Sequence, residues 1–125
     1  MIRTTHVLIT LVSFALATGV LQAESAADRN LSHAELAKMI RAAHTPQQYQ
    51  SLAGYYRSRQ AAFEKQAQEE KAEWDRRSQN IVGPAAKFPR PVDSSRNRYE
   101  YFTYEAQQMS QQATHYESLS ASSAQ

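Results

Sequence analysis

The sequence has no cysteine and very few glycines, and both shortages restrict what the chain can form. Without cysteine it has neither disulfide bonds nor the residue to which a bacterial lipoprotein attaches its lipid. Three glycines in 125 residues leave few positions for hairpins and tight turns. Valine and isoleucine are also scarce after residue 23, and are confined to Ile40, Ile81, Val82 and Val92. Residues that favour helices dominate instead, so the sequence predicts an all-α protein.

Residues 1–23 have the three-part pattern of a secretory signal peptide. Arg3 precedes the uncharged apolar run VLITLVSFALATGVL, and Ala23 is a small residue at the expected cleavage site. The run has about 15 residues, fewer than the roughly 20 of a membrane-spanning helix. We therefore expect a cleaved signal and an exported protein of the bacterial periplasm or exterior, without membrane anchoring after cleavage. Cleavage after Ala27, or retention of the segment as an anchor, is the alternative.

Charges of both signs are interleaved along the chain. The formal net charge is +2, and loss of Arg3, the only charged residue in 1–23, leaves +1. Basic residues lie among acids and glutamines in stretches such as KQAQEEKAEWDRR. Because nucleic-acid binding requires a concentrated basic surface, we expect no nucleic-acid partner.

A capping box marks the start of a short first helix. Ser32 lies three residues before Glu35, the spacing at which each side chain bonds the other residue's backbone N–H. An apolar stripe at helical spacing follows, and consists of Leu36, Met39, Ile40 and Ala43. The sequence predicts a helix over 32–43, preceded by a flexible segment, 24–31.

The stretch HTPQQYQSLAGYY marks the start of a long second helix. Thr45 is a good N-cap, Pro46 suits the first helical position, and Gln48 completes a second capping box. No helix breaker follows until Gly83, so the sequence predicts a helix over 46–79. Its apolar stripe, which Gln60 and Lys71 interrupt, contains Tyr49, Leu52, Tyr56, Phe63, Ala67 and Trp74.

Prolines separate this helix from a third. The segment 80–94 contains three prolines and one glycine and is expected to be a stiff, extended linker. Ser94 or Ser95 then caps a helix over 95–118, and a disordered tail, 120–125, follows. The stripe of the third helix has the alternating three- and four-residue spacing of a coiled coil, through Tyr99, Phe102, Ala106, Met109, Ala113 and Tyr116.

The two long stripes are expected to face each other. We predict an antiparallel helical hairpin of two long helices with a short N-terminal helix, as one domain over 32–119. A two-helix seam buries little apolar area, so a homodimeric helical bundle is the alternative. The predicted seam, which is also the candidate interaction surface, consists of Tyr49, Leu52, Tyr56, Phe63, Tyr99, Phe102, Met109 and Tyr116.

Three further tyrosines, Tyr55, Tyr101 and Tyr104, fall beside or off the stripes and are candidates for exposure. Arginines flank them in the sequence, and tyrosine with arginine is enriched at protein interfaces. The alternative is a wide core in which the tyrosine hydroxyls reach water.

No motif indicates an enzyme or a cofactor site. His33, His44 and His115 lack the acid or second histidine three or four residues upstream that a metal site on one helix requires. Met39 and Met109 lie on apolar stripes, where methionine fills core space. We expect no catalysis and no cofactor. A metal or small-ligand carrier with these histidines on separate helices is the weaker alternative.

Two stretches carry a resemblance to known proteins. TPQQYQSLAGYYRSRQ before a long charged helix, and Ala113–Leu119 (ATHYESL) near the end, resemble small exported bacterial helical-hairpin proteins of unknown function. The chain also resembles, more loosely, periplasmic stress chaperones of the Spy/CpxP type, although their LTxxQ motif is absent. The first resemblance implies a secreted helical hairpin and no activity. From the apolar stripes and the tyrosines we predict an exported helical protein that acts through contacts with a protein partner, in a structural or interaction role. A periplasmic chaperone is the alternative.

Overall fold

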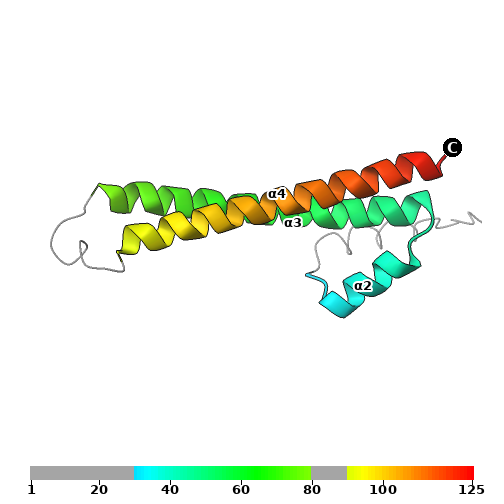
Figure 1. Ribbon diagram of the computed structural model, residues 1–125, viewed down its shortest axis with the longest axis horizontal. Coiled ribbons are helices and arrows are strands. Elements are labelled where there is room, and N and C mark those ends of the chain that lie inside the picture. Colours follow the sequence, from blue (N-terminus) through cyan, green and yellow to red (C-terminus); the bar gives the residue numbers. More distant parts are fainter. Residues whose placement is uncertain (1–29, 80–89) are drawn as a thin grey trace, which may run out of the picture.

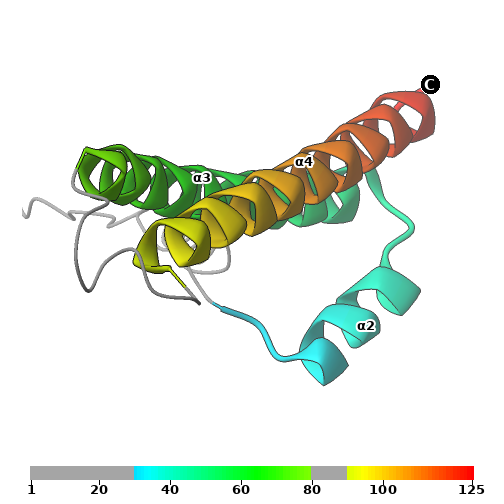
Figure 2. The same ribbon diagram turned by 60° about the vertical axis from the view of Figure 1, so that its left-hand side comes forward.

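The computed structural model describes residues 30–79 and 90–125, which form three α-helices and no strand. They are α2 (His33–Ala42), α3 (Pro46–Ser78) and α4 (Pro91–Ser123). The long helices α3 and α4 pack side by side as an antiparallel hairpin (Figure 1). The shorter α2 lies beside the end of the hairpin where α3 begins and α4 ends (Figures 1 and 2). The predicted all-α hairpin is confirmed.

Several sequence predictions fall outside these ranges. The predicted signal segment 1–23, residues 24–29 of the predicted flexible segment and residues 80–89 of the predicted linker lie outside the described residues. Leu31, which closes the flexible segment of the prediction, is half-buried and packs against the core. In the part of the chain that is described, no helix combines the length and the apolar character needed to cross a membrane.

Both predicted capping boxes form, and they fix where α2 and α3 begin. The Oγ of Ser32 accepts a hydrogen bond from the backbone N–H of Glu35 at 3.3 Å, and Glu35 Oε2 accepts one from the backbone N–H of Ser32 at 2.9 Å. Thr45 Oγ1 accepts from the N–H of Gln48 at 3.3 Å, and Gln48 Oε1 accepts from that of Thr45 at 3.1 Å. Each box satisfies N–H groups that the first helical turn leaves without partners.

The start of α4 differs from the prediction. The helix begins at Pro91, four residues before the predicted start, so residues 91–94 of the predicted linker are helical. Proline suits this first position because its missing N–H has no helical partner there. Arg90 and Asp93 form an ion pair across the first turn (Nε to Oδ2, 2.8 Å). Ser95 is not a cap but a fully buried residue of the seam.

The end of α4 also differs, because the predicted disordered tail is helical as far as Ser123. Ser120 is buried, and its Oγ donates a hydrogen bond to the carbonyl oxygen of Pro46 at 3.1 Å. Leu119 packs against the core. These contacts hold the last turns of α4 against the start of α3, and residues 120–123 therefore continue the helix.

The core lies at the α2 end of the hairpin and is thin. Its buried residues are Leu52, Ala53, Tyr55, Tyr56, Ala113 and Tyr116. Small residues, Ala67 and Ala106 among them, are buried in the part of the seam nearer the end of α3 and the start of α4. Leu52 is the only large apolar side chain with less than 2% of its surface exposed among the described residues.

Candidate functional site

Aromatic rings meet across the seam along its whole length. Between ring centroids the distances are 6.4 Å for Tyr49–Tyr116, 5.6 Å for Tyr56–Tyr116, 6.3 Å for Phe63–Phe102 and 5.8 Å for Trp74–Tyr99. Residue numbers rise along α3 as they fall along α4, which is the register of an antiparallel pair. Of the eight predicted seam residues, Leu52, Tyr56 and Tyr116 are buried. The other five are half-buried: Tyr49, Phe63, Tyr99, Phe102 and Met109.

The three tyrosines proposed as exposed do not share one environment. Tyr101 and Tyr104 are 54% and 57% exposed, as predicted. Tyr55 is buried, with 6% of its surface exposed, and that prediction is wrong. It belongs to the core cluster against which Leu36 of α2 also packs, and its ring meets that of Tyr56 edge-on at 5.4 Å. A stripe read from helical spacing follows one side of α3 only, whereas α3 also has a side turned toward α2.

A groove of about 480 Å³ lies between the first turn of α2 and the hairpin. Its apolar lining consists of Leu31, Leu36, Tyr55, Tyr56, Phe63 and Met109. Its polar lining consists of Asn30, His33, Arg59, Glu105, Gln108 and Gln112. We call this the aromatic groove. All three helices contribute to it, so residues far apart in the sequence form one concave surface.

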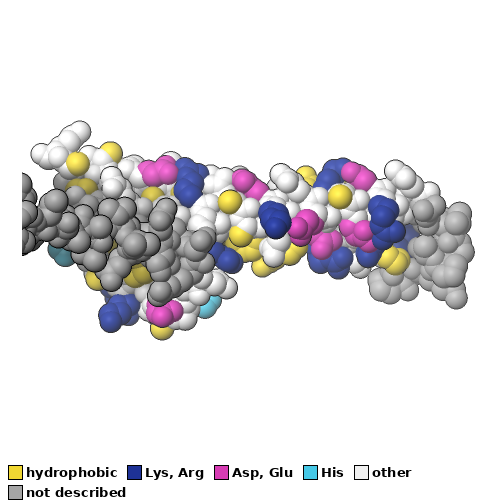
Figure 3. Space-filling view, turned by 180° about the vertical axis from the view of Figure 1, so that it is seen from behind, with side chains coloured by type: hydrophobic (Ala, Val, Ile, Leu, Met, Phe, Trp, Pro, Cys, Tyr) yellow, Lys and Arg dark blue, Asp and Glu magenta, His cyan; other side chains and the backbone are white. Residues whose placement is uncertain are grey.

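Exposed aromatic surface continues from the groove along the hairpin. The Phe63 ring stacks on Phe102, whose ring meets the exposed Tyr101 at 5.3 Å. The guanidinium carbon of Arg59 lies 4.8 Å from the centroid of the Phe63 ring. Seen from behind, hydrophobic side chains gather at mid-length of the hairpin on its lower edge, the side on which α2 lies (Figure 3).

The other flank of the hairpin carries a polar clasp across the seam. Arg57 of α3 forms a two-pronged ion pair with Glu117 of α4, at 2.9 Å (Nε to Oε1) and 3.0 Å (Nη2 to Oε2). Its Nη1 donates to Gln60 Oε1 at 2.8 Å and to Ser110 Oγ at 3.3 Å. The hydrogen bond from Arg57 lowers the pKa of the Glu117 carboxyl. Gln60, which the sequence shows as an interruption of the stripe, is therefore a partner of the clasp.

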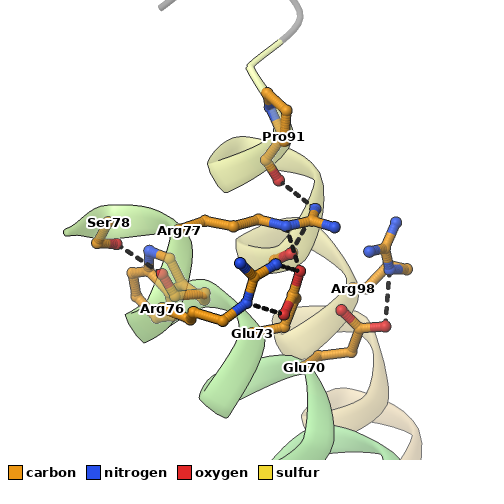
Figure 4. A network of polar contacts seen from close by, with 9 residues as sticks. Glu70, Glu73, Arg76, Arg77, Ser78, Pro91 and Arg98 are labelled. Atoms are coloured by element: carbon orange, nitrogen blue, oxygen red, sulfur yellow. Dashed lines mark hydrogen bonds and ion pairs between the residues drawn. The ribbon is translucent and has the colours of Figure 1, made fainter. Parts of the chain in front are cut away.

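A second polar network ties the two helices together where α3 ends and α4 begins (Figure 4). Arg77 of α3 donates from Nη1 to the carbonyl oxygen of Pro91 at 2.8 Å and to the buried Oγ of Ser95 at 2.9 Å. Its Nε bonds Glu73, which also accepts from Arg76. These contacts anchor the first turns of α4 on the last turns of α3. Nearby, Arg98 pairs with Glu70 at 2.8 Å.

This network gives the stability of the hairpin a dependence on acid pH. Hydrogen bonds from Arg76, then from Arg77, lower the pKa of Glu73 from 4.5 to about 2. Because the folded state holds this carboxyl ionised, its contribution is complete above pH 4.5 and is lost as the pH falls toward 2. We expect Glu73→Gln to be less stable than the native protein at pH 6, with the difference vanishing near pH 2. Urea unfolding at both pH values measures it. A difference that does not change with pH would contradict the assignment.

The histidines lie apart from one another. His33 lines the aromatic groove, the Nδ1 of His44 lies 2.8 Å from the carbonyl oxygen of Ala42, and the ring of His115 meets Tyr116 edge-on. In residues 30–79 and 90–125, no three histidine or acidic side chains come together as metal ligands. Met39 packs against the core cluster.

Comparison of the chain with protein-family models, with curated proteins and with solved structures finds no match.

Proposed function

We propose that this protein is an exported, non-enzymatic interaction protein whose aromatic groove, with the adjoining Tyr101, contacts the surface of another protein chain. The carrying observation is that this one side of the molecule combines open aromatic surface, methionine and arginine in a concave site. These residue types are enriched at the centres of protein interfaces. Support for export comes from the signal-peptide pattern of residues 1–23.

Electrostatics also distinguishes this side of the hairpin. Arg57 and Arg98 each pair with a carboxylate of the facing helix. Arg77 pairs with Glu73 on its own helix and also donates hydrogen bonds to Pro91 and Ser95 of α4. Arg59 and Glu105 line the aromatic groove, and no ion pair to either occurs within the described ranges. Two opposite charges on the walls of one groove, without pairing to each other, are suited to a partner that brings its own charges.

Site-specific photo-crosslinking in the producing cell tests this proposal. Benzoylphenylalanine at position 101 places the probe beside the groove, whereas position 103 places it two residues along the same helix, on the other flank. Thr103 is exposed and lies with Tyr99 and Ala106 on that flank. We expect a defined protein adduct from position 101 and little or none from position 103. The absence of any adduct from position 101 would reject the proposal.

A further inference from the structure

We propose that the protein chain which occupies the aromatic groove is a second copy of this chain. The two copies are related by a two-fold axis that runs along the hairpin, so that α3 of each faces α4 of the other. The inference rests on the proposed function, because it names the partner of the same site.

The first argument is the shortage of buried apolar surface in one copy. Among the described residues, Leu52 is the only large apolar side chain with less than 2% of its surface exposed. Phe63 and Phe102, at mid-length of the hairpin, are only half-buried although they stack on each other. A small domain normally needs a larger core than one two-helix seam supplies. A second copy laid over these rings completes a four-helix core.

The second argument is that the charges of the groove are complementary to themselves. Arg59 projects from α3 and Glu105 from α4, and both line the groove with Phe63, so they lie at a similar level along the hairpin. In a two-fold contact the same patch of both copies forms the interface. If a residue i of one copy contacts a residue j of the other, then j of the first copy also contacts i of the second. A copy placed with α3 over α4 brings Glu105 to Arg59 twice.

The same charges favour a two-fold axis along the hairpin over one that runs across it. An axis across the hairpin would place α4 over α4 and bring each Glu105 close to its own counterpart, which like charges disfavour. An axis along the hairpin brings opposite charges together instead. The low net charge of the chain, +2 in total, adds little general repulsion between copies.

Charge reversal followed by mixing tests the inference. Arg59→Glu and Glu105→Arg each replace two attractive contacts by two repulsive ones, and each is expected to weaken the dimer about tenfold or more. An equimolar mixture of the two variants restores opposite charges in the heterodimer alone. Sedimentation of the purified proteins over a range of concentrations measures the dimer affinity of the native protein, of each variant and of the mixture. Circular dichroism tests whether the helices of the variants remain folded.

A matched control is Glu100→Arg, which makes the same charge change on α4. Glu100 is exposed and lies three residues before Thr103, on the other flank. We expect a native dimer, two weakened variants, recovery on mixing and no effect of the control. A native protein that is monomeric at every concentration, or a mixture without recovery, would overturn the inference. If position 101 then crosslinks to a different protein, the proposed function stands without the dimer.

Discussion

Replacement of Tyr116 by alanine is expected to lower the free energy of unfolding by about 3–5 kcal/mol, the usual range for loss of a buried large aromatic side chain. Tyr116 is 7% exposed, and its ring lies between those of Tyr49 and Tyr56. Burial raises the pKa of its hydroxyl. The substitution removes both ring contacts and leaves a cavity in the core cluster, to which α3 and α4 contribute and against which α2 packs.

Urea unfolding followed by circular dichroism measures this loss. The matched control is Tyr104→Ala, on the same helix but 57% exposed, which is expected to change the free energy by no more than about 0.5 kcal/mol. If the two variants were equally stable, the antiparallel register between α3 and α4 would be wrong.

Replacement of Leu52 by alanine is expected to cost about 3 kcal/mol, because the vacated volume cannot be refilled by its neighbours. Leu52 is 1% exposed and belongs to the same cluster as Ala113, which has no exposed surface. The side chain of Ala113 is a single methyl group, which is too short to fill the cavity left by the leucine. A stability of about 5–15 kcal/mol is usual for a folded protein, so this loss is a large fraction of the total.

Leu36→Ala provides the comparison for that experiment. Leu36 lies on α2, is half-buried and packs on the edge of the core, so we expect its loss to cost less than that of Leu52. The ratio of the two costs reports how firmly α2 is attached. A larger effect at position 36 than at position 52 would show that the core is centred on α2, contrary to the structure.

Local signals in the sequence were enough to predict the starts of α2 and α3 and the pairing of the long helices. The capping boxes at Ser32 and Thr45 depend on residues three positions apart, so no tertiary information is required. The stripes that include Phe63 and Phe102 depend on helical periodicity. Both kinds of signal can be recognised within a single segment of the sequence, without knowledge of which segments contact each other.

Features that depend on contacts between segments were missed. Tyr55 is buried on the side of α3 that faces α2, which a single stripe does not reveal. The clasp of Arg57 with Glu117 joins residues sixty positions apart. A signal was nevertheless present, since Gln60 interrupts an otherwise apolar stripe and such a residue needs a polar partner.

The aromatic groove itself could not be predicted for the same reason. It forms only when the first turn of α2 comes beside α3 and α4, and its two charged residues, Arg59 and Glu105, lie on different helices. In the sequence these two residues look like members of a solvated helix face. Their shared location in one groove is a result of the tertiary structure.

The central claim is that one side of the hairpin is the contact surface of the protein. The most direct test is the yield of photo-crosslinked adduct from position 101 compared with that from position 103, in the producing cell. We predict a several-fold higher yield from position 101, with an adduct of twice the mass of one chain. Equal yields from the two flanks would contradict the account.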